Sequence, residues 1–390
     1  MVEGLGYLRR YDQPDKIDKA IASFQSAVAA DPRYAHAYVG LAQARRFRYD
    51  LLKETRSLDD ALEDASRALA LNDRLAPAHI AMGMIQTDKG ENERAESEFR
   101  TALMLEPRNA DAYRELASTY RALGRTDMAE ATYKHAIDLR QDDWWSWKQL
   151  GVFYFNNGQL GEAERCFLEV IRLTPDSAKA YSNLGGLYGR MGRYAAAIVQ
   201  VRKSLSIKPT SDGYDNLGGI YYWSGDYLQA SAQFEKAIKM APENSRFWGD
   251  LADAYRWAPR LGPKAPDTYR HAIDLIQREI AVNPLDAQLR SRLATWWAAL
   301  SRRQEAILEI QKAIRLAPHD GLVLYHSALV YEQAGERERA LLALRAALKA
   351  GYPTDKARRA LPLETLREHP RYRRTVDPGY PLTKVPVNKE

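Results

Sequence analysis

The residues most able to carry catalysis or to hold a metal ion lie singly along this chain of 390 residues. Its seven histidines are residues 36, 79, 135, 271, 319, 326 and 369, and none lies within metal-ligand spacing of another histidine or of Cys166, the only cysteine. Neither HExxH nor GxSxG occurs. Cys166 stands among apolar residues in AERCFLEV, which predicts a buried, inert thiol. The sequence therefore predicts no enzyme, no metal site and no cofactor.

One glycine-rich stretch, YSNLGGLYGRMG from Tyr181 to Gly192, raises the question of a phosphate-binding loop. Such a loop lies between a strand and a helix, where free backbone N–H groups point at the anion. The stretch returns 33 residues later as YDNLGGIYYWSG, from Tyr214 to Gly225. A nucleotide site has no reason to recur at that interval, whereas a stacking unit does. The glycines are therefore interpreted as packing and turn residues.

The composition allows a large core and excludes several classes of protein. Apolar residues make up 45% of the chain and charged residues 28%, as in ordinary soluble proteins. The net charge of +6 is spread over the whole sequence, whereas nucleic-acid binding needs basic residues on one face. No apolar run approaches the length of about 18 residues that a membrane span needs, and the N-terminus lacks a hydrophobic signal region. We therefore expect a cytoplasmic protein without a membrane span.

A repeated sequence pattern covers most of the chain. Ten alanines stand in one register, most of them followed four residues later by a bulky residue: Ala20, Ala61, Ala95, Ala129, Ala163, Ala197, Ala230, Ala272, Ala306 and Ala340. Upstream of each alanine, apolar residues recur at i, i+3, i+4 and i+7, which is one face of an α-helix. A glycine then ends this first helix in many units, and a proline often follows the second helix. Each unit is therefore predicted to be a helical hairpin.

Small residues explain how the two helices of a hairpin meet. Glycine or alanine in the first helix is expected to face alanine in the second, so that the backbones approach closely. A larger side chain at such a position is expected to destabilise the unit by overpacking.

These motifs, Trp/Tyr-x2-Leu-Gly/Ala-x2-Tyr and then Ala-x3-Phe/Tyr-x2-Ala and Pro on a period of 34 residues, resemble the tetratricopeptide repeat family. The resemblance implies an all-α solenoid of about ten helix-turn-helix units in a right-handed superhelix, whose first helices line a concave groove that binds peptides or proteins. The expected repeats are 1–34, 35–75, 76–109, 110–143, 144–177, 178–210, 211–244, 245–286, 287–320 and 321–354. A helical cap is expected at 355–376 and a disordered tail at 377–390.

Three units depart from the pattern. The first has Gly4 where an aromatic residue is usual and Leu8 where a small one is usual, so its first helix is expected to fray. The second unit gains seven residues around 50–57, and the eighth gains eight around 258–267, as a loop between its helices. Both are interpreted as surface insertions, and a partner contact through Arg260 and Lys264 is the alternative.

The face of each first helix opposite to its packing side would line the groove. Read through repeats five to eight, this polar stripe contains Trp145, Lys148, Gln149, Phe155, Asn156, Ser182, Asn183, Arg190, Asp215, Asn216, Tyr222, Trp223, Asp250, Asp253, Arg256 and Trp257. At the sixth position of these four repeats stand Gln149, Asn183, Asn216 and Asp250, which form a ladder of three amides and one carboxylate. Carboxamides both donate and accept hydrogen bonds, so they suit an extended peptide backbone. The stripe also supplies aromatic anchors.

Other interpretations of the stripe remain open. Asparagine before Leu-Gly is common in the family whatever the ligand, and some of the aromatic residues are equally suited to packing between repeats. The lysine-asparagine clamp that recognises acidic C-terminal tails is not met, because Lys148 is followed by Val152 where the asparagine would stand.

The leading functional interpretation is a non-enzymatic scaffold that binds a protein or peptide in the groove. One alternative is a regulatory region of a multidomain bacterial signalling protein. Residues 4–44 and LETLREHPRYRR resemble repeat regions of bacterial serine/threonine kinases and TolB-like regulators, although HRD and DFG are absent. The other is an RNA-binding solenoid. The oligomeric state is not predicted.

Overall fold

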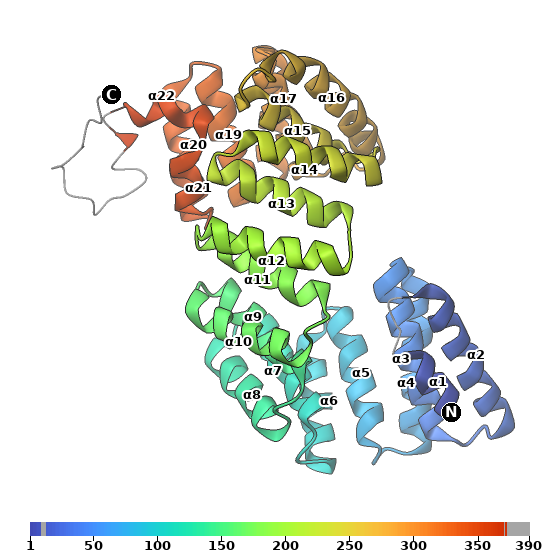
Figure 1. The fold of residues 1–390 in the computed structure, drawn as a ribbon. Helices are drawn as coiled ribbons and strands as arrows, with labels where there is room; N and C mark the ends of the chain where they lie inside the picture. The colour runs from blue at the N-terminus through green and yellow to red at the C-terminus, as the bar shows by residue number, and fades with distance from the viewer. Residues whose placement is uncertain (9–12, 370, 373–390) are drawn as a thin grey trace. The chain divides into compact units, whose positions relative to one another are not determined.

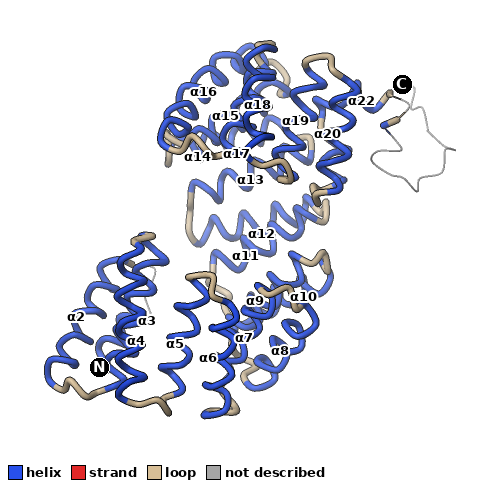
Figure 2. The backbone as a smooth tube through the Cα atoms, turned by 180° about the vertical axis from the view of Figure 1, so that it is seen from behind, coloured by secondary structure: helices blue, strands red, loops and turns tan. Residues whose placement is uncertain are grey.

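A computed structural model of the chain describes residues 1–8, 13–369 and 371–372. These residues form helices joined by loops, and no strand occurs in these three ranges (Figure 2). The chain divides into two compact units, Met1–Pro175 and Asp176–Glu390. The predicted tail at 377–390 and the last four residues of the predicted cap lie outside the described residues.

Unit 1 is a stack of antiparallel helix pairs, in which each odd-numbered helix packs on the even-numbered helix that follows it (Figure 1). Its helices are α1 (Val2–Leu8), α2 (Pro14–Ala30), α3 (Ala35–Leu52), α4 (Thr55–Leu71), α5 (Ala76–Asp88), α6 (Asn92–Leu105), α7 (Ala110–Ala122), α8 (Thr126–Leu139), α9 (Trp144–Asn156) and α10 (Leu160–Leu173).

Unit 2 continues the same pairing and ends in shorter elements. Its helices are α11 (Ala178–Arg190), α12 (Tyr194–Ile207), α13 (Ser211–Ser224), α14 (Tyr227–Met240), α15 (Ser245–Trp257), α16 (Ala265–Val282), α17 (Ala287–Ala299), α18 (Arg303–Leu316), α19 (Gly321–Gln333), α20 (Arg337–Lys349), α21 (Thr354–Arg359) and α22 (Glu364–Arg367). Two 3₁₀ turns, η1 (Gly262–Lys264) and η2 (Leu361–Leu363), precede α16 and α22. The described residues are thus an all-α solenoid.

The glycines predicted to end the first helices lie at the C-terminal ends of those helices. Gly90, Gly124, Gly158, Gly192, Gly225 and Gly335 all have positive φ, a conformation that ends a helix and that glycine adopts without steric cost. The first helices α3, α15 and α17 lack this glycine, and the residues with positive φ near their ends are Lys53, Arg260 and Ser301.

The small residues of the first helices contact a different partner from the one expected. A Cβ built on Gly151 would lie 2.7 Å from the ring of Phe167, and one built on Gly218 would lie 2.6 Å from the ring of Phe234. These phenylalanines stand four residues after the repeat alanine, so the aromatic ring, more than the alanine, fills the space that glycine leaves. Gly185 comes nearer to the expectation, because Val201 and the carbonyl of Ala197 both lie close to it.

The first repeat shows the same contact, and this changes the repeat position that we assign to Gly4. A Cβ on Gly4 of α1 would lie 2.7 Å from the ring of Phe24, and one on Gly40 of α3 would lie 2.5 Å from it. Gly4 therefore takes the place of the small packing residue, and not that of an aromatic residue. The short α1 contributes Gly4 and Leu8, both of them buried, to the packing of α2.

The two insertions are largely helical. Residues 50–52 extend α3 and residues 55–57 begin α4, which leaves only Lys53 and Glu54 between the helices. In the eighth repeat the loop expected at 258–267 contains η1, and its last three residues already belong to α16.

The elements after α20 close the apolar core of unit 2. Ala357, Ala360, Leu363 and Leu366 are buried in one cluster with residues of α19 and α20. An apolar end surface of the repeat stack is thereby covered, as solenoids require at their ends.

Adjacent glycines of α13 provide a matched test of the helix contact. Gly218→Ala should lower the free energy of unfolding by about 1–3 kcal/mol, since Phe234 is 3% exposed and leaves no room for a methyl group. Gly219→Ala should be neutral or stabilising by up to about 1 kcal/mol, since nothing lies within 4 Å of its Cβ position. Urea unfolding followed by circular dichroism measures both, and equal midpoints for the two variants would contradict the assigned contact.

Candidate functional site

The predicted polar stripe is divided between the two units, and its first five residues lie on α9 of unit 1. Gln149 and Phe155 are half-buried and Asn156 is exposed. The Nζ of Lys148 lies 4.0 Å from the centroid of the Trp145 ring. A cation over the face of an indole is attracted to it, so this contact orders the start of α9.

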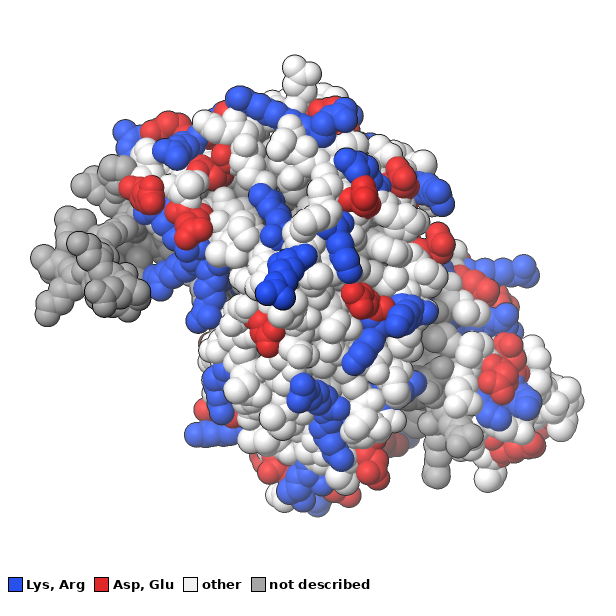
Figure 3. Space-filling view, turned by 45° about the horizontal axis from the view of Figure 1, so that its top comes forward, with Lys and Arg blue, Asp and Glu red and all other residues white. Residues whose placement is uncertain are grey.

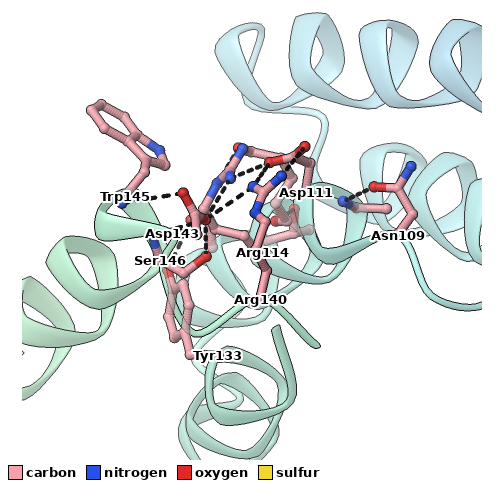
Figure 4. Close-up of polar contacts among 12 residues, drawn as sticks. Asn109, Asp111, Arg114, Tyr133, Arg140, Asp143, Trp145 and Ser146 are labelled. Atoms are coloured by element: carbon pink, nitrogen blue, oxygen red, sulfur yellow. Dashed lines mark hydrogen bonds and ion pairs between the residues drawn. The ribbon is translucent and has the colours of Figure 1, made fainter. Parts of the chain in front are cut away.

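A network of ion pairs fixes the same end of α9 (Figure 4). Asp143 caps the helix, since its carboxylate accepts hydrogen bonds from the backbone N–H groups of Trp145 and Ser146 at 3.3 Å. The guanidinium groups of Arg114 and Arg140 lie 3.3 and 3.2 Å from that carboxylate. Burial acts to raise the pKa of Asp143, but the hydrogen bond from Ser146 and the two arginines lower it below its usual value. Asp143 is therefore an ionised cap that holds Trp145 in position.

In unit 2, the predicted amides of α11 and α13 have no hydrogen-bond partners among the described residues. Asn183 is half-buried and Asn216 is exposed, and neither side chain makes a hydrogen bond to any other described residue. Gly186 and Gly219 lie three residues further along each helix, with open space where a Cβ would stand. The other predicted residues of these helices are Ser182, Arg190, Asp215, Tyr222 and Trp223.

Asp215 of α13 and Asp250 of α15 form a carboxyl pair. Asp215 is 7% exposed, its Oδ1 is buried without a hydrogen-bond partner among the described residues, and the carboxyl group of Asp250 acts on it as a neighbouring like charge. Arg246 lies 3.1 Å from the second oxygen of Asp215 and also contacts Asp212. Two adjacent repeats are therefore joined by the ion pair of Arg246 with Asp215, next to the carboxyl group of Asp250.

The surroundings of these carboxyl groups favour their neutral form. Burial and the facing Asp250 raise the pKa of Asp215 to about 8. Burial also raises the pKa of Asp250, against the opposing effect of Arg292 and Arg246. At neutral pH, the pair therefore retains a proton that a solvated aspartate would have lost.

Two other predicted residues of α15, Asp253 and Arg256, have hydrogen-bond partners within unit 2. The hydroxyl of Tyr269 on α16 donates to Asp253, whose pKa burial raises to about 7. Arg256 donates to Oε1 of Gln333 on α19 at 3.2 Å, and its guanidinium lies 5.0 Å from the ring of Trp257. Asp253 and Arg256 therefore tie α15 to other helices, in contrast to Asn183 and Asn216.

The aromatic residues at the end of α13 pack among themselves and against α21. Tyr222 meets Trp223 edge-on, with centroids 5.6 Å apart, and meets Tyr227 at 5.3 Å. The Nζ of Lys356 on α21 lies 5.6 Å from the centroid of Trp223. Part of this predicted anchor is therefore engaged by the closing helices of its own unit.

The predicted stripe covers repeats five to eight only. It omits the residues at the same positions of repeats nine and ten. There Ser291 and Arg292 lie on α17, and His326 lies on α19. Ser291 Oγ lies 2.9 Å from Nδ1 of His326, and burial together with Arg292 lowers the pKa of that histidine to about 3. The repeat register alone was sufficient to find these residues, because they continue the positions of Asp215 and Asp250.

The described residues give little support to other kinds of chemistry. No group of three or more His, Cys, Asp or Glu side chains among them is arranged to hold a metal ion. Ser291 is fully buried beside a neutral histidine, so it is not an accessible nucleophile. Within the described ranges, no helix is both long and apolar enough to span a membrane. Figure 3 shows Lys and Arg interspersed with Asp and Glu over one face of the molecule.

Comparison with known families agrees with the repeat. Three family models, each described as a tetratricopeptide repeat, match residues 86–150, 145–210 and 217–262. No curated protein sequence matches the chain significantly.

Several solved structures are similar to parts of this chain. The human IFIT1 dimer with m7Gppp-AAAA is 20% identical over 80% of this chain and 70% of its own, with a TM-score of 0.53. PilF of Pseudomonas aeruginosa is 21% identical over 54% of this chain and 93% of its own, with a TM-score of 0.45. YrrB, a TPR protein with an unusual peptide-binding site, is 26% identical over 48% of this chain and 92% of its own, with a TM-score of 0.33. The likeness to IFIT1 shows the fold alone.

The carboxyl pair makes a specific prediction about pH. In the unfolded chain both aspartates lose their protons near pH 4, whereas the folded pair keeps one until about pH 8. The pair's contribution to stability therefore falls as the pH rises from about 4 to about 8. Asp250→Asn should raise the free energy of unfolding more at pH 8.5 than at pH 5, by on the order of 2 kcal/mol. Thermal unfolding at the two pH values measures the difference.

Asp212→Asn is the matched control for that experiment. The Asp212 side chain is 75% exposed and contacts the same Arg246. Its removal should change stability little and about equally at both pH values. An Asp250→Asn variant with the same pH profile as wild type would show that the pair is ionised in the folded protein.

Proposed function

Residues 86–150, 145–210 and 217–262 match tetratricopeptide repeat models, and from that premise we propose that the chain is a non-enzymatic scaffold that binds an extended segment of a partner protein. The binding face is the exposed side of the first helices, opposite to the side that packs against the second helices. A preformed face of this kind lowers the ordering cost of association.

The observation that carries the proposal is the pair of unused amides in unit 2. Asn183 and Asn216 occupy the same position in adjacent repeats, and each can donate and accept a hydrogen bond. The side chains make no hydrogen bond to any other described residue, so they are free to pair with a peptide backbone. Gly186 and Gly219 leave space beside them for a backbone to approach.

The chemistry of the face favours a peptide over RNA. Arg246 of α15 is already paired with Asp212 and Asp215, and Arg256 donates to Gln333, so these cations are less available to a phosphate backbone. The capped RNA bound by IFIT1 is a property of that protein, with which this chain shares the fold. A filter-binding assay with single-stranded RNA should therefore show no salt-dependent retention.

Affinity capture from a lysate of the source cells, followed by titration of the captured peptide, tests the proposal. Asn183→Ala with Asn216→Ala should weaken the bound peptide by about 1–3 kcal/mol, since the backbone groups lose their partners. Micromolar binding by the wild type corresponds to about −8 kcal/mol.

The matched control is Gln277→Ala with Gln304→Ala, two exposed amides on the second helices α16 and α18. This variant should bind like wild type. If all three proteins have the same affinity, with circular dichroism confirming the fold, the amides of α11 and α13 are not the binding groups.

A further inference from the structure

Unit 1 contains a pocket of about 360 Å³ between α3, α5 and α7. Its apolar wall includes Phe47 of α3 together with Ile80 and Met84 of α5. Ile80 is 8% exposed, while Phe47 and Met84 are half-buried. In the repeat register these residues fall on the exposed side of the first helices, on the same stripe in repeats two and three. The pocket is thus a hollow in the proposed binding face of unit 1.

The volume and the wall suit a single large side chain. Ligand pockets in proteins are typically about 300–1,000 Å³, so this one lies near the lower end of that range. Met84 adapts its shape to different apolar groups, because its unbranched chain is flexible. At the rim, Gln43 makes no hydrogen bond to any other described residue, so its amide is available to the backbone of a peptide.

Arg46 and Arg114 also line the pocket, but carboxylates already bind both of them. Arg46 donates to both oxygens of Asp88, at 2.5 and 3.2 Å. Arg114 is 9% exposed and donates to Glu115 from Nε and Nη2 at 3.1 and 2.9 Å. Its remaining nitrogen contacts Asp111 at 2.5 Å (Figure 4). Both guanidinium groups therefore already have carboxylate partners and do not need an anionic ligand.

The charged residues that line the pocket are Arg46, Arg114 and Asp111, and the ion-pair network that these arginines enter contains more carboxylates than guanidinium groups. Three guanidinium groups, those of Arg46, Arg114 and Arg140, share ion pairs with five carboxylates: Asp50, Asp88, Asp111, Glu115 and Asp143. The surplus of negative charge attracts cations and repels the head group of a fatty acid or of an anionic lipid.

We propose that this pocket takes one large apolar side chain, such as phenylalanine or leucine, from a partner peptide in which lysine or arginine flanks that residue. The inference rests on the proposed function and adds the class of sequence that unit 1 selects. The apolar side chain fills the space beside Ile80 and Met84, the peptide backbone pairs with Gln43, and the flanking cations lie over the surplus carboxylates.

Fluorescence anisotropy with the full chain and defined probes tests the proposal. The probe is a fluorescein-labelled nine-residue peptide with a central phenylalanine flanked by lysines. One comparison peptide has alanine at the centre, and another has glutamates in place of the lysines. The lysine-flanked phenylalanine peptide should bind with a micromolar dissociation constant, and both comparison peptides should bind at least tenfold more weakly.

Substitutions of similar size locate the binding. Met84→Gln should weaken the phenylalanine peptide at least fivefold, because a polar group then faces the apolar side chain. Met104→Gln is the control, since Met104 of α6 is 74% exposed and does not line the pocket. It should leave binding unchanged.

Three results would overturn the inference: equal binding of the alanine or glutamate peptide, unchanged binding by Met84→Gln, or displacement of the probe by dodecanoate. These are separable from a failure of the proposed function. If capture still depends on Asn183 and Asn216, the scaffold stands without this pocket. If capture with the wild type yields no partner at all, the scaffold proposal fails as well.

Discussion

The structure depends on a contact that several repeats share, between a glycine of the first helix and a large apolar residue of the second. Glycine at positions such as 151 and 218 lets the phenylalanine ring lie directly against the backbone of the first helix. Because protein interiors are close-packed, this contact fixes the distance between the helices and hence the spacing at which the next pair stacks. Every other feature of the chain is arranged around this constraint.

Since one side of each first helix is committed to packing, its opposite side is available for other chemistry. On α11 and α13 that side carries unused amides beside glycines, whereas on α15 it carries Asp253 and Arg256, which bind residues of α16 and α19. Helices of the same repeat type therefore differ in function. On α11 and α13 the amides have no hydrogen-bond partner among the described residues, whereas the residues of α15 hold unit 2 together.

The repeat was predictable from sequence because helix periodicity, the glycine ends and the spacing of the alanines are local properties of the chain. Two helices per unit and a turn with positive φ follow from such patterns. The partner of Gly218 was not predictable in the same way, because alanine and phenylalanine both recur with the repeat and only the geometry separates them. The register of α1 was misread for a related reason, since a truncated helix retains Gly4 but not the residues that would align it.

The candidate site was predictable only as a set of positions. The stripe identified Asn183, Asn216 and Asp215, but their different states depend on neighbours that lie a repeat or more away. Burial and the facing carboxyl group of Asp250 raise the pKa of Asp215, while Asn216, the next residue, has no hydrogen-bond partner among the described residues. Sequence spacing gives the side of a helix on which a residue lies, but not whether that residue is satisfied there.

Net charge is an equally poor guide to the binding faces. The chain carries a net charge of +6, yet the ion-pair network beside the pocket of unit 1 contains more carboxylates than guanidinium groups. Most of the basic excess must therefore lie on other surfaces. The electrostatic field at a groove depends on the few charges that line it with low-dielectric walls. A basic protein can consequently present acidic faces, and the sign of those faces selects its ligands.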